Sequence, residues 1–245
     1  MFLYITSALL LLSVYSWSIE NGSVPSAFQA FPLQTISIDR SKTLYVKTGM
    51  MQAFSSNVEM STTMQFSMCA IARKYLGGED LVVNSFTANS SKKQGWVSLE
   101  ESFVGQTVQH VILPGEVLIM KKKALMAFDE NVDLSVGLSG IHGYLSSIGF
   151  VIVQAKTRDQ NPGRVFFASE KGVVKKLQIS SEETGALVDN KQIIAYTGSL
   201  TPFTKAPGNF FSWGYGKEGF VTQFSGYGDL YVGTCVDFIE KESTK

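Results

Sequence analysis

Residues 44–60 read LYVKTGMMQAFSSNVEM and align without a gap on residues 118–134, LIMKKKALMAFDENVDL. A looser third copy follows at residues 187–200, LVDNKQIIAYTGSL. Self-similarity at a roughly fixed spacing indicates one structural unit that is built several times. Residues of a motif that recurs in this way are expected to pack in the core and not to form an active site. The repeated core motif comprises Ala53, Phe54, Asn57, Val58, Ala127, Phe128, Asn131, Val132, Ala195 and Tyr196.

Most of the chain outside these copies alternates apolar and polar residues, which is the period of a β-strand. Residues 106–113, QTVQHVIL, and 132–136, VDLSV, show this alternation, and the runs end at Gly, Pro, Asn or Ser. In each copy an aromatic residue, a small polar turn, a glycine and a second alternating strand follow the motif. We therefore expect an all-β fold of three pseudo-symmetric β-hairpin or sandwich repeats, which close around a pseudo-threefold axis and hide their apolar faces.

The length of 245 residues and the 44% of hydrophobic residues suffice for one large core. We expect a single β domain over residues 34–238, with a loose segment before it and a short tail after it. The expected ranges are 1–18 for a leader, 19–33 for the loose segment, 34–113, 114–182 and 183–238 for the three repeats, and 239–245 for the tail.

The charges of the chain balance, with 21 Lys and Arg against 21 Asp and Glu. A general nucleic-acid binder needs a basic surface to neutralise phosphates, so we expect no nucleic-acid partner. The clearest basic run, Lys121–Lys123, falls where the other copies of the motif have turn residues. Such a run is typical of a solvated hairpin turn.

Residues 1–18, MFLYITSALLLLSVYSWS, carry no charge and are interpreted as a signal peptide or a membrane anchor. The apolar run is shorter than the roughly 20 residues of a membrane span. This favours the secretory pathway or an extracellular location, with a membrane-anchored or mitochondrial protein as the alternative. Membrane contact is expected only through this segment, if it is not cleaved.

Two cysteines and two sequons accompany the leader. Cys69 and Cys235 are the only cysteines, and they are a candidate disulfide that the sequence leaves open. Asn21 and Asn89 each begin an Asn-x-Ser tripeptide and are candidate N-glycosylation sites. Such tripeptides also arise by chance, so they support a secretory route only weakly.

No catalytic, cofactor or metal motif stands out. Residues 214–219, GYGKEG, match G-x-G-x-x-G, but a dinucleotide site needs a helix after the motif and a strand is expected here. The two histidines, His110 and His142, and the two cysteines lack the spacing of metal ligands. We expect a protein that is not an enzyme and that binds no cofactor or metal.

Three segments in order resemble one known family. Residues 73–81, RKYLGGEDL, with Phe86-Thr87, resemble the R-x-L-x-G-G-E-x-L-F…F-T segment of the altered inheritance of mitochondria protein 24 family. Residues 113–116, LPGE, with 125–128, LMAF, resemble its L-x-P-G-E…L-V-A-F pattern. Residues 218–234 are similar to its closing G-E-G-x-V…F-x-G-x-G-x-V-Y-V-Q-T stretch. The resemblance covers roughly residues 35–235.

The resemblance implies an all-β, three-repeat fold similar to the tryptophan RNA-binding attenuator protein, no established enzymatic activity, and a link to mitochondrial or membrane organisation. The leading hypothesis is a non-catalytic β-scaffold that assembles with itself or with protein partners. The alternative is a small-ligand-binding module that uses aromatic residues at the repeat boundaries. RNA binding and a hydrolase built on Cys and His are less favoured. The aromatic candidates are Trp96, Trp213, Tyr215 and Tyr227.

Overall fold

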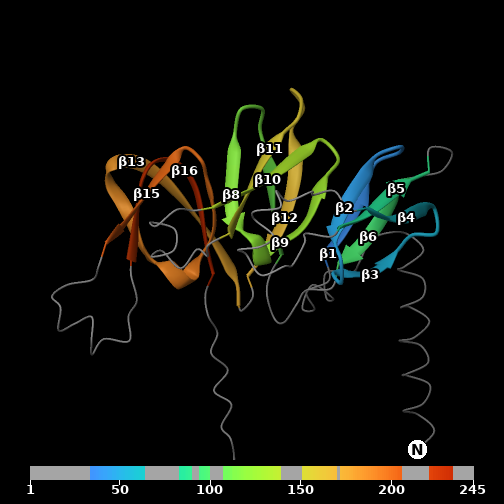
Figure 1. Cartoon of the computed structure of the whole chain (residues 1–245), viewed down its shortest axis with the longest axis horizontal. Helices are drawn as coiled ribbons and strands as arrows, with labels where there is room; N and C mark the ends of the chain where they lie inside the picture. The colour runs from blue at the N-terminus through green and yellow to red at the C-terminus, as the bar shows by residue number, and fades with distance from the viewer. Residues whose placement is uncertain are drawn as a thin grey trace, which may run out of the picture. The chain divides into compact units, whose positions relative to one another are not determined.

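The computed structural model describes seven stretches of the chain, all within one compact unit that spans Gln34–Lys245. Apart from two 3-10 turns, the regular elements of these stretches are β-strands, so the expectation of an all-β fold is confirmed (Figure 1). The described residues are 34–63, 83–89, 94–99, 107–138, 151–169, 172–205 and 221–233.

The strands fall into three groups by their order in the chain and their pairing. The first group holds β1 (Gln34–Ile38), β2 (Thr43–Lys47), β3 (Met51–Phe54), β4 (Val58–Thr63), β5 (Val83–Ala88) and β6 (Gly95–Leu99). The second holds β7 (Thr107–Ile112), β8 (Val117–Lys121), β9 (Leu125–Asp129), β10 (Val132–Leu138), β11 (Val151–Thr157) and β12 (Gly163–Ala168). The third holds β13 (Val174–Asp189), β14 (Ile193–Thr197), β15 (Leu200–Lys205) and β16 (Val221–Gly233).

Each group contains two antiparallel three-strand arrangements. In the first group β6 pairs with β1 and β3, and β5 pairs with β2 and β4. In the second group β12 pairs with β7 and β9, and β11 pairs with β8 and β10. The order of strands along the chain and within each arrangement is therefore the same in both groups.

The third group makes the same arrangements from two long strands. Residues 228–233 of β16 pair with 174–179 of β13, and 230–232 also pair with β14. Residues 221–224 of β16 pair with 186–189 of β13 and with β15. A register shift between Ser181 and Ala186 separates the two halves of β13. Gly185 lies in this shift, and a Cβ there would overlap the carbonyl oxygen of Phe224.

Two further strand pairs connect the groups. β2 of the first group pairs with β9 of the second, and β8 of the second pairs with β14 of the third. We call each of these pairs a joint. The joints merge the arrangements into sheets of six and seven strands, whereas β1, β6 and β3 stay a separate three-stranded sheet.

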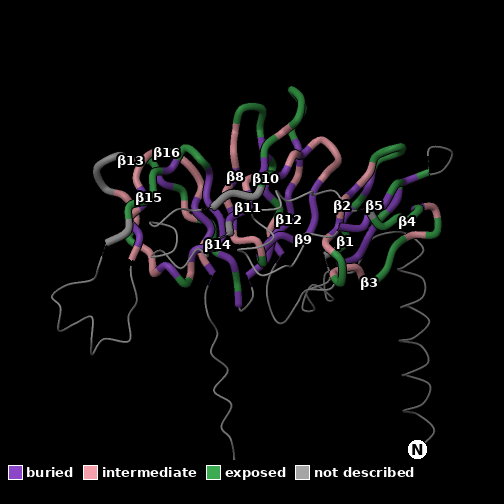
Figure 2. The backbone as a smooth tube through the Cα atoms, viewed as in Figure 1, coloured by how far each residue is buried: buried purple, intermediate pink, exposed green. Residues whose placement is uncertain are grey.

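Alternation along the strands builds the core. β2 and β8 both bury every second residue (Figure 2), as the period of two predicts. The largest core cluster extends from Val83 of β5 through the second group to Tyr231 of β16. Burial of one large apolar side chain contributes about 1.5–3 kcal/mol, so the core stabilises each joint as well as each group.

Candidate functional site

The repeated motif occupies equivalent places in the three groups. Ala53 and Phe54 end β3, Ala127 and Phe128 lie in β9, and Ala195 and Tyr196 lie in β14. Ala127 and Ala195 are buried within the joints, directly opposite Val46 and Met120. In the second and third groups the motif therefore packs where one group meets the next, whereas Ala53 and Phe54 lie on β3, which pairs with β6.

The Asn-Val part of the motif packs on a glycine. A Cβ on Gly95 would overlap Cγ2 of Val58, and a Cβ on Gly163 would overlap Cγ2 of Val132. The backbone oxygen of Asn57 accepts from Asn89 N at 2.9 Å, and that of Asn131 accepts from Arg158 N at 2.7 Å. The contact with the glycine gives a reason for the recurrence of the valine.

A side-chain acceptor follows the Ala-aromatic pair in every group. Ser55 Oγ accepts from Trp96 N at 3.0 Å, and Asp129 Oδ2 accepts from Arg164 N at 2.9 Å. Thr197 Oγ1 accepts from Asp229 N at 3.1 Å. A comparison of the copies by identity missed these residues because they differ in type. What they share is a side-chain oxygen at the position directly after the Ala-aromatic pair.

The two joints share one register. Glu130 N donates to Thr43 O at 3.1 Å in the first joint, and Gly198 N donates to Val117 O at 2.6 Å in the second. An aromatic side chain lies opposite a large side chain in both. The opposed pairs are Leu44 with Asp129, Tyr45 with Phe128 and Val46 with Ala127, then Leu118 with Thr197, Ile119 with Tyr196 and Met120 with Ala195.

Ion pairs surround the first joint. Arg164 donates through Nε and Nη2 to the two carboxylate oxygens of Asp129, each at 2.9 Å, and this hydrogen bonding raises the pKa of Arg164. Lys42 Nζ lies 3.0 Å from Glu130 Oε1, and Thr43 N donates to Glu130 Oε2 at 3.0 Å. The stacked rings of Tyr45 and Phe128, with centroids 5.2 Å apart, complete this joint.

A cavity of about 570 Å³ lies beside these ion pairs. Its charged lining is already paired: Asp129 with Arg164, Glu130 with Lys42, and Asp39 with Gln94 Nε2 at 2.8 Å. Hydrogen bonds from Asn161 lower the pKa of Asp159, which also lines the cavity. The polar groups of the cavity therefore stabilise one another.

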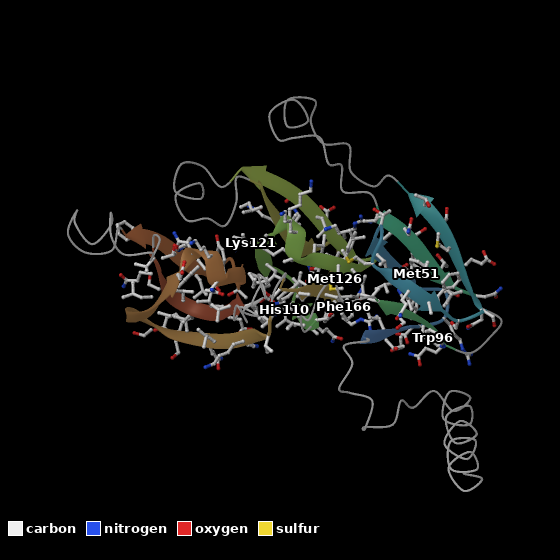
Figure 3. The ribbon with its side chains drawn as sticks, turned by 90° about the horizontal axis from the view of Figure 1, so that it is seen from below. Met51, Trp96, His110, Lys121, Met126 and Phe166 are labelled. Atoms are coloured by element: carbon white, nitrogen blue, oxygen red, sulfur yellow. The ribbon has the colours of Figure 1, made fainter. Side chains whose placement is uncertain are left out.

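Beside the second joint, a largely buried hydrogen-bonded cluster connects the second group to the third. His110 Nδ1 lies 2.7 Å from Tyr231 Oη, and His110 Nε2 lies 3.2 Å from Glu116 Oε1. Burial, together with the charges of Asp229 and Glu116, raises the pKa of Tyr231. The cluster connects β7 to β16, so it too fixes one group against the next. In Figure 3, His110 lies within the molecule, and Met126 and Phe166, which share a core cluster, lie close together.

β1, β4, β7 and β10 end their sheets in the described part of the chain and take part in no joint. Two further edges, which have the positions that form joints elsewhere, have no joint partner there. β3 pairs there only with β6, and residues 186–189 of β13 pair only with β16. Within its group, β3 has the same position as β9 and β14, which form joints. Residues 186–189 have the same position in their group as β2 and β8, which form the other halves of those joints. Phe54 is 36% exposed, whereas Phe128 is 1% and Tyr196 is 7% exposed. These two open edges are the candidate functional site.

The other candidate residues from the sequence have different positions. Asn89 is exposed directly after β5, while Asn21, Cys69 and Cys235 lie outside the described residues. Trp96 on β6 and Tyr227 on β16 belong to different sheets, and Trp213 and Tyr215 lie outside the described residues. Within the stretches that the structure describes, no group of His, Cys, Asp and Glu side chains could hold a metal ion. A helix long and apolar enough to cross a membrane is also missing from these stretches.

Comparison with known proteins agrees with this fold. The crystal structure of protein SPYM3_0169 from Streptococcus pyogenes superposes with a TM-score of 0.61 at 22% sequence identity, covering 83% of this chain and 88% of that protein. A search of curated proteins finds no match. The model of one family, described as mitochondrial biogenesis AIM24, matches residues 28–235. Since that match covers most of the sequence, the chain belongs to the AIM24 family.

Proposed function

We propose that this protein is a non-catalytic β-scaffold that assembles with itself or with protein partners. The observation that carries the proposal is the pair of open edges, β3 and residues 186–189, each of which carries an exposed apolar side chain. Unpaired strand edges are templates for another chain, and proteins that stay monomeric usually block them with charge, proline or bulges. Met51–Phe54 contains no charged residue and no proline. It does contain a register shift between Met51 and Ala53, but the same shift between Ile193 and Ala195 does not prevent β14 from pairing with β8.

The three strand groups are proposed to be copies of one unit. Their common pairing order, their joints and the acceptor after the Ala-aromatic pair support this. Closure of the three units around a pseudo-threefold axis stays a prediction. It would require β3 to meet residues 186–189 of the same chain, and the same two edges are those that assembly would use.

The place of action is proposed from the family and from the leader. The description of the family refers to mitochondrial biogenesis, which favours a mitochondrial or membrane-organising role. The uncharged leader favours the secretory pathway instead. Mass spectrometry of the N-terminus and of Asn89 in protein from its native cells separates the two: a start near Ile19 with a glycan on Asn89 supports the secretory route, and a bare Asn89 with another start supports the mitochondrial one.

The scaffold proposal is tested by measuring the molar mass of the purified protein and by identifying protein partners that cross-link to it. The purified full chain is measured by light scattering after size exclusion, over a wide concentration range, and partners are sought by cross-linking in native cells. We expect species larger than one chain or a defined protein partner. A chain that stays monomeric at every concentration and captures no protein would contradict the scaffold.

A further inference from the structure

We propose that the open edges of two copies pair with each other, so that β3 of one copy and residues 186–189 of the next form a third joint. This inference rests on the proposed scaffold function and names its partner as a second copy of the chain. The two edges differ in sequence and position, so the contact is head-to-tail. Such a contact gives a ring if the rotation closes and a filament if it does not.

The existing joints predict the register of the third. Residues 44–46 of β2 and 118–120 of β8 have the same positions relative to β5 and β11 as residues 186–188 have relative to β16. By the same comparison, Ala53 and Phe54 of β3 correspond to Ala127 and Phe128 of β9. In the third joint Leu187 therefore lies opposite Phe54, and Val188 lies opposite Ala53.

The side chains at these positions fit that register. Leu187 is 63% exposed and Phe54 is 36% exposed, so the two residues predicted to meet are both apolar and both accessible. The ring of Phe54 also packs edge-on against Phe86, with centroids 5.4 Å apart, which holds it at this edge. In the first joint the same position holds Tyr45 against the ring of Phe128. A backbone hydrogen bond from Ser56 N to Gly185 O is expected, because Glu130 N to Thr43 O and Gly198 N to Val117 O have that place in the formed joints.

A second copy is the occupant that the joints favour. The two formed joints link the three groups in series and leave β3 at one end of the series and residues 186–189 at the other. Each chain thus carries the two halves of one further joint: β3 at one end of the series and residues 186–189 at the other. A second chain offers the complementary half at each end, by the same antiparallel strand addition that joins the groups within the chain.

The test uses disulfide formation between single-cysteine variants. In a full-length Cys69→Ser/Cys235→Ser background, one preparation carries Ala53→Cys and a second, isotopically labelled preparation carries Val188→Cys. Residues directly opposite in an antiparallel pair have Cα atoms about 4.5–5.5 Å apart, within the range of a disulfide. The matched control replaces Ala53→Cys by Thr62→Cys on β4, which is also an exposed strand position.

Mild oxidation of the mixture is expected to link labelled to unlabelled chains through positions 53 and 188, with little product in the control. A chain carrying both substitutions that forms the disulfide within itself at high dilution would overturn the proposal in favour of intrachain closure. Absence of the disulfide in both formats would also overturn it. If the unmodified chain still self-associates in that case, the scaffold stands and only this joint is wrong.

A charge at the joint gives an independent measurement. Leu187→Lys places an ammonium opposite Phe54 and removes an exposed apolar side chain, so the dissociation constant of the assembly should rise at least about tenfold. Thermal stability of the separated chain should change little, because Leu187 is exposed there. Met60→Lys, at a 44% exposed position on β4, is the control and should leave association unchanged. Equal effects of both variants would contradict the joint.

Discussion

Individual glycines decide how closely the strands of one group approach. Gly163 lies against Val132 and Asn131, and a Cβ there would come within 2.9 Å of Asn131 Oδ1 and overlap the valine. The recurrence of valine in the motif thus has a simple physical reason: the valine fills the space that the glycine leaves. The same contact between Gly95 and Val58 shows that the reason applies twice.

Gly163→Ala is expected to lower the free energy of unfolding by about 1–3 kcal/mol, the usual cost of overpacking a core. Urea denaturation measures the loss. Val132→Ala in the same chain should recover part of it, because the smaller side chain makes room for the new methyl group. If the two substitutions added without any coupling, the proposed glycine–valine contact would be contradicted.

Ionisation of Tyr231 is expected to lower the stability of the fold at alkaline pH. Burial raises its pKa above the ordinary value of 10.0, and burial also raises the pKa of Tyr196. The folded state therefore keeps these protons at a pH where the unfolded chain has begun to lose them. Stability from this source is present below about pH 10 and decreases as the pH rises further.

Tyr231→Phe is expected to lower the free energy of unfolding at pH 7 by about 1–3 kcal/mol, since buried His110 loses its partner at 2.7 Å. The decline of stability above pH 10 should become shallower in this variant. Denaturation curves at pH 7 and at several values above 10 measure both effects. An unchanged alkaline decline would show that Tyr231 does not cause it.

At the level of elements, one motif has two environments. Ala53-Phe54 and Ala127-Phe128 are identical in sequence, so a sequence comparison predicts equal burial. The structure buries the second pair and exposes the first, because β9 has β2 on its free side and β3 has no described neighbour there. Pairing between segments more than 80 residues apart is not encoded in the local pattern, and the open edges could not be predicted from it.

Leucine at the two alanine positions separates stability from association. Ala127→Leu enlarges a side chain that is 0% exposed in the first joint, and should cost about 1–3 kcal/mol of stability. Ala53→Leu lies on the exposed edge strand and should change the stability of the separated chain by less than about 0.5 kcal/mol. Thermal unfolding of dilute protein compares them. A large loss in Ala53→Leu would mean that β3 is already covered within one chain.

Over the whole molecule, the sequence predicted the all-β class of fold well. Alternation of apolar residues was sufficient for this, since β2 and β8 bury every second side chain. The acceptors Ser55, Asp129 and Thr197 could not be found by identity, because three different residues accept the same kind of hydrogen bond. The expected closure around a pseudo-threefold axis needs a contact between the ends of the series of groups, which no local pattern specifies.

The central claim is that one chain completes the open edge of the next, and the mixed single-cysteine experiment tests it most directly. The account predicts a disulfide between position 53 of an unlabelled chain and position 188 of a labelled one, identified by mass spectrometry of the linked peptides. A disulfide between these positions within a single chain would contradict it. So would a yield of the disulfide between chains no higher than that of the Thr62→Cys control.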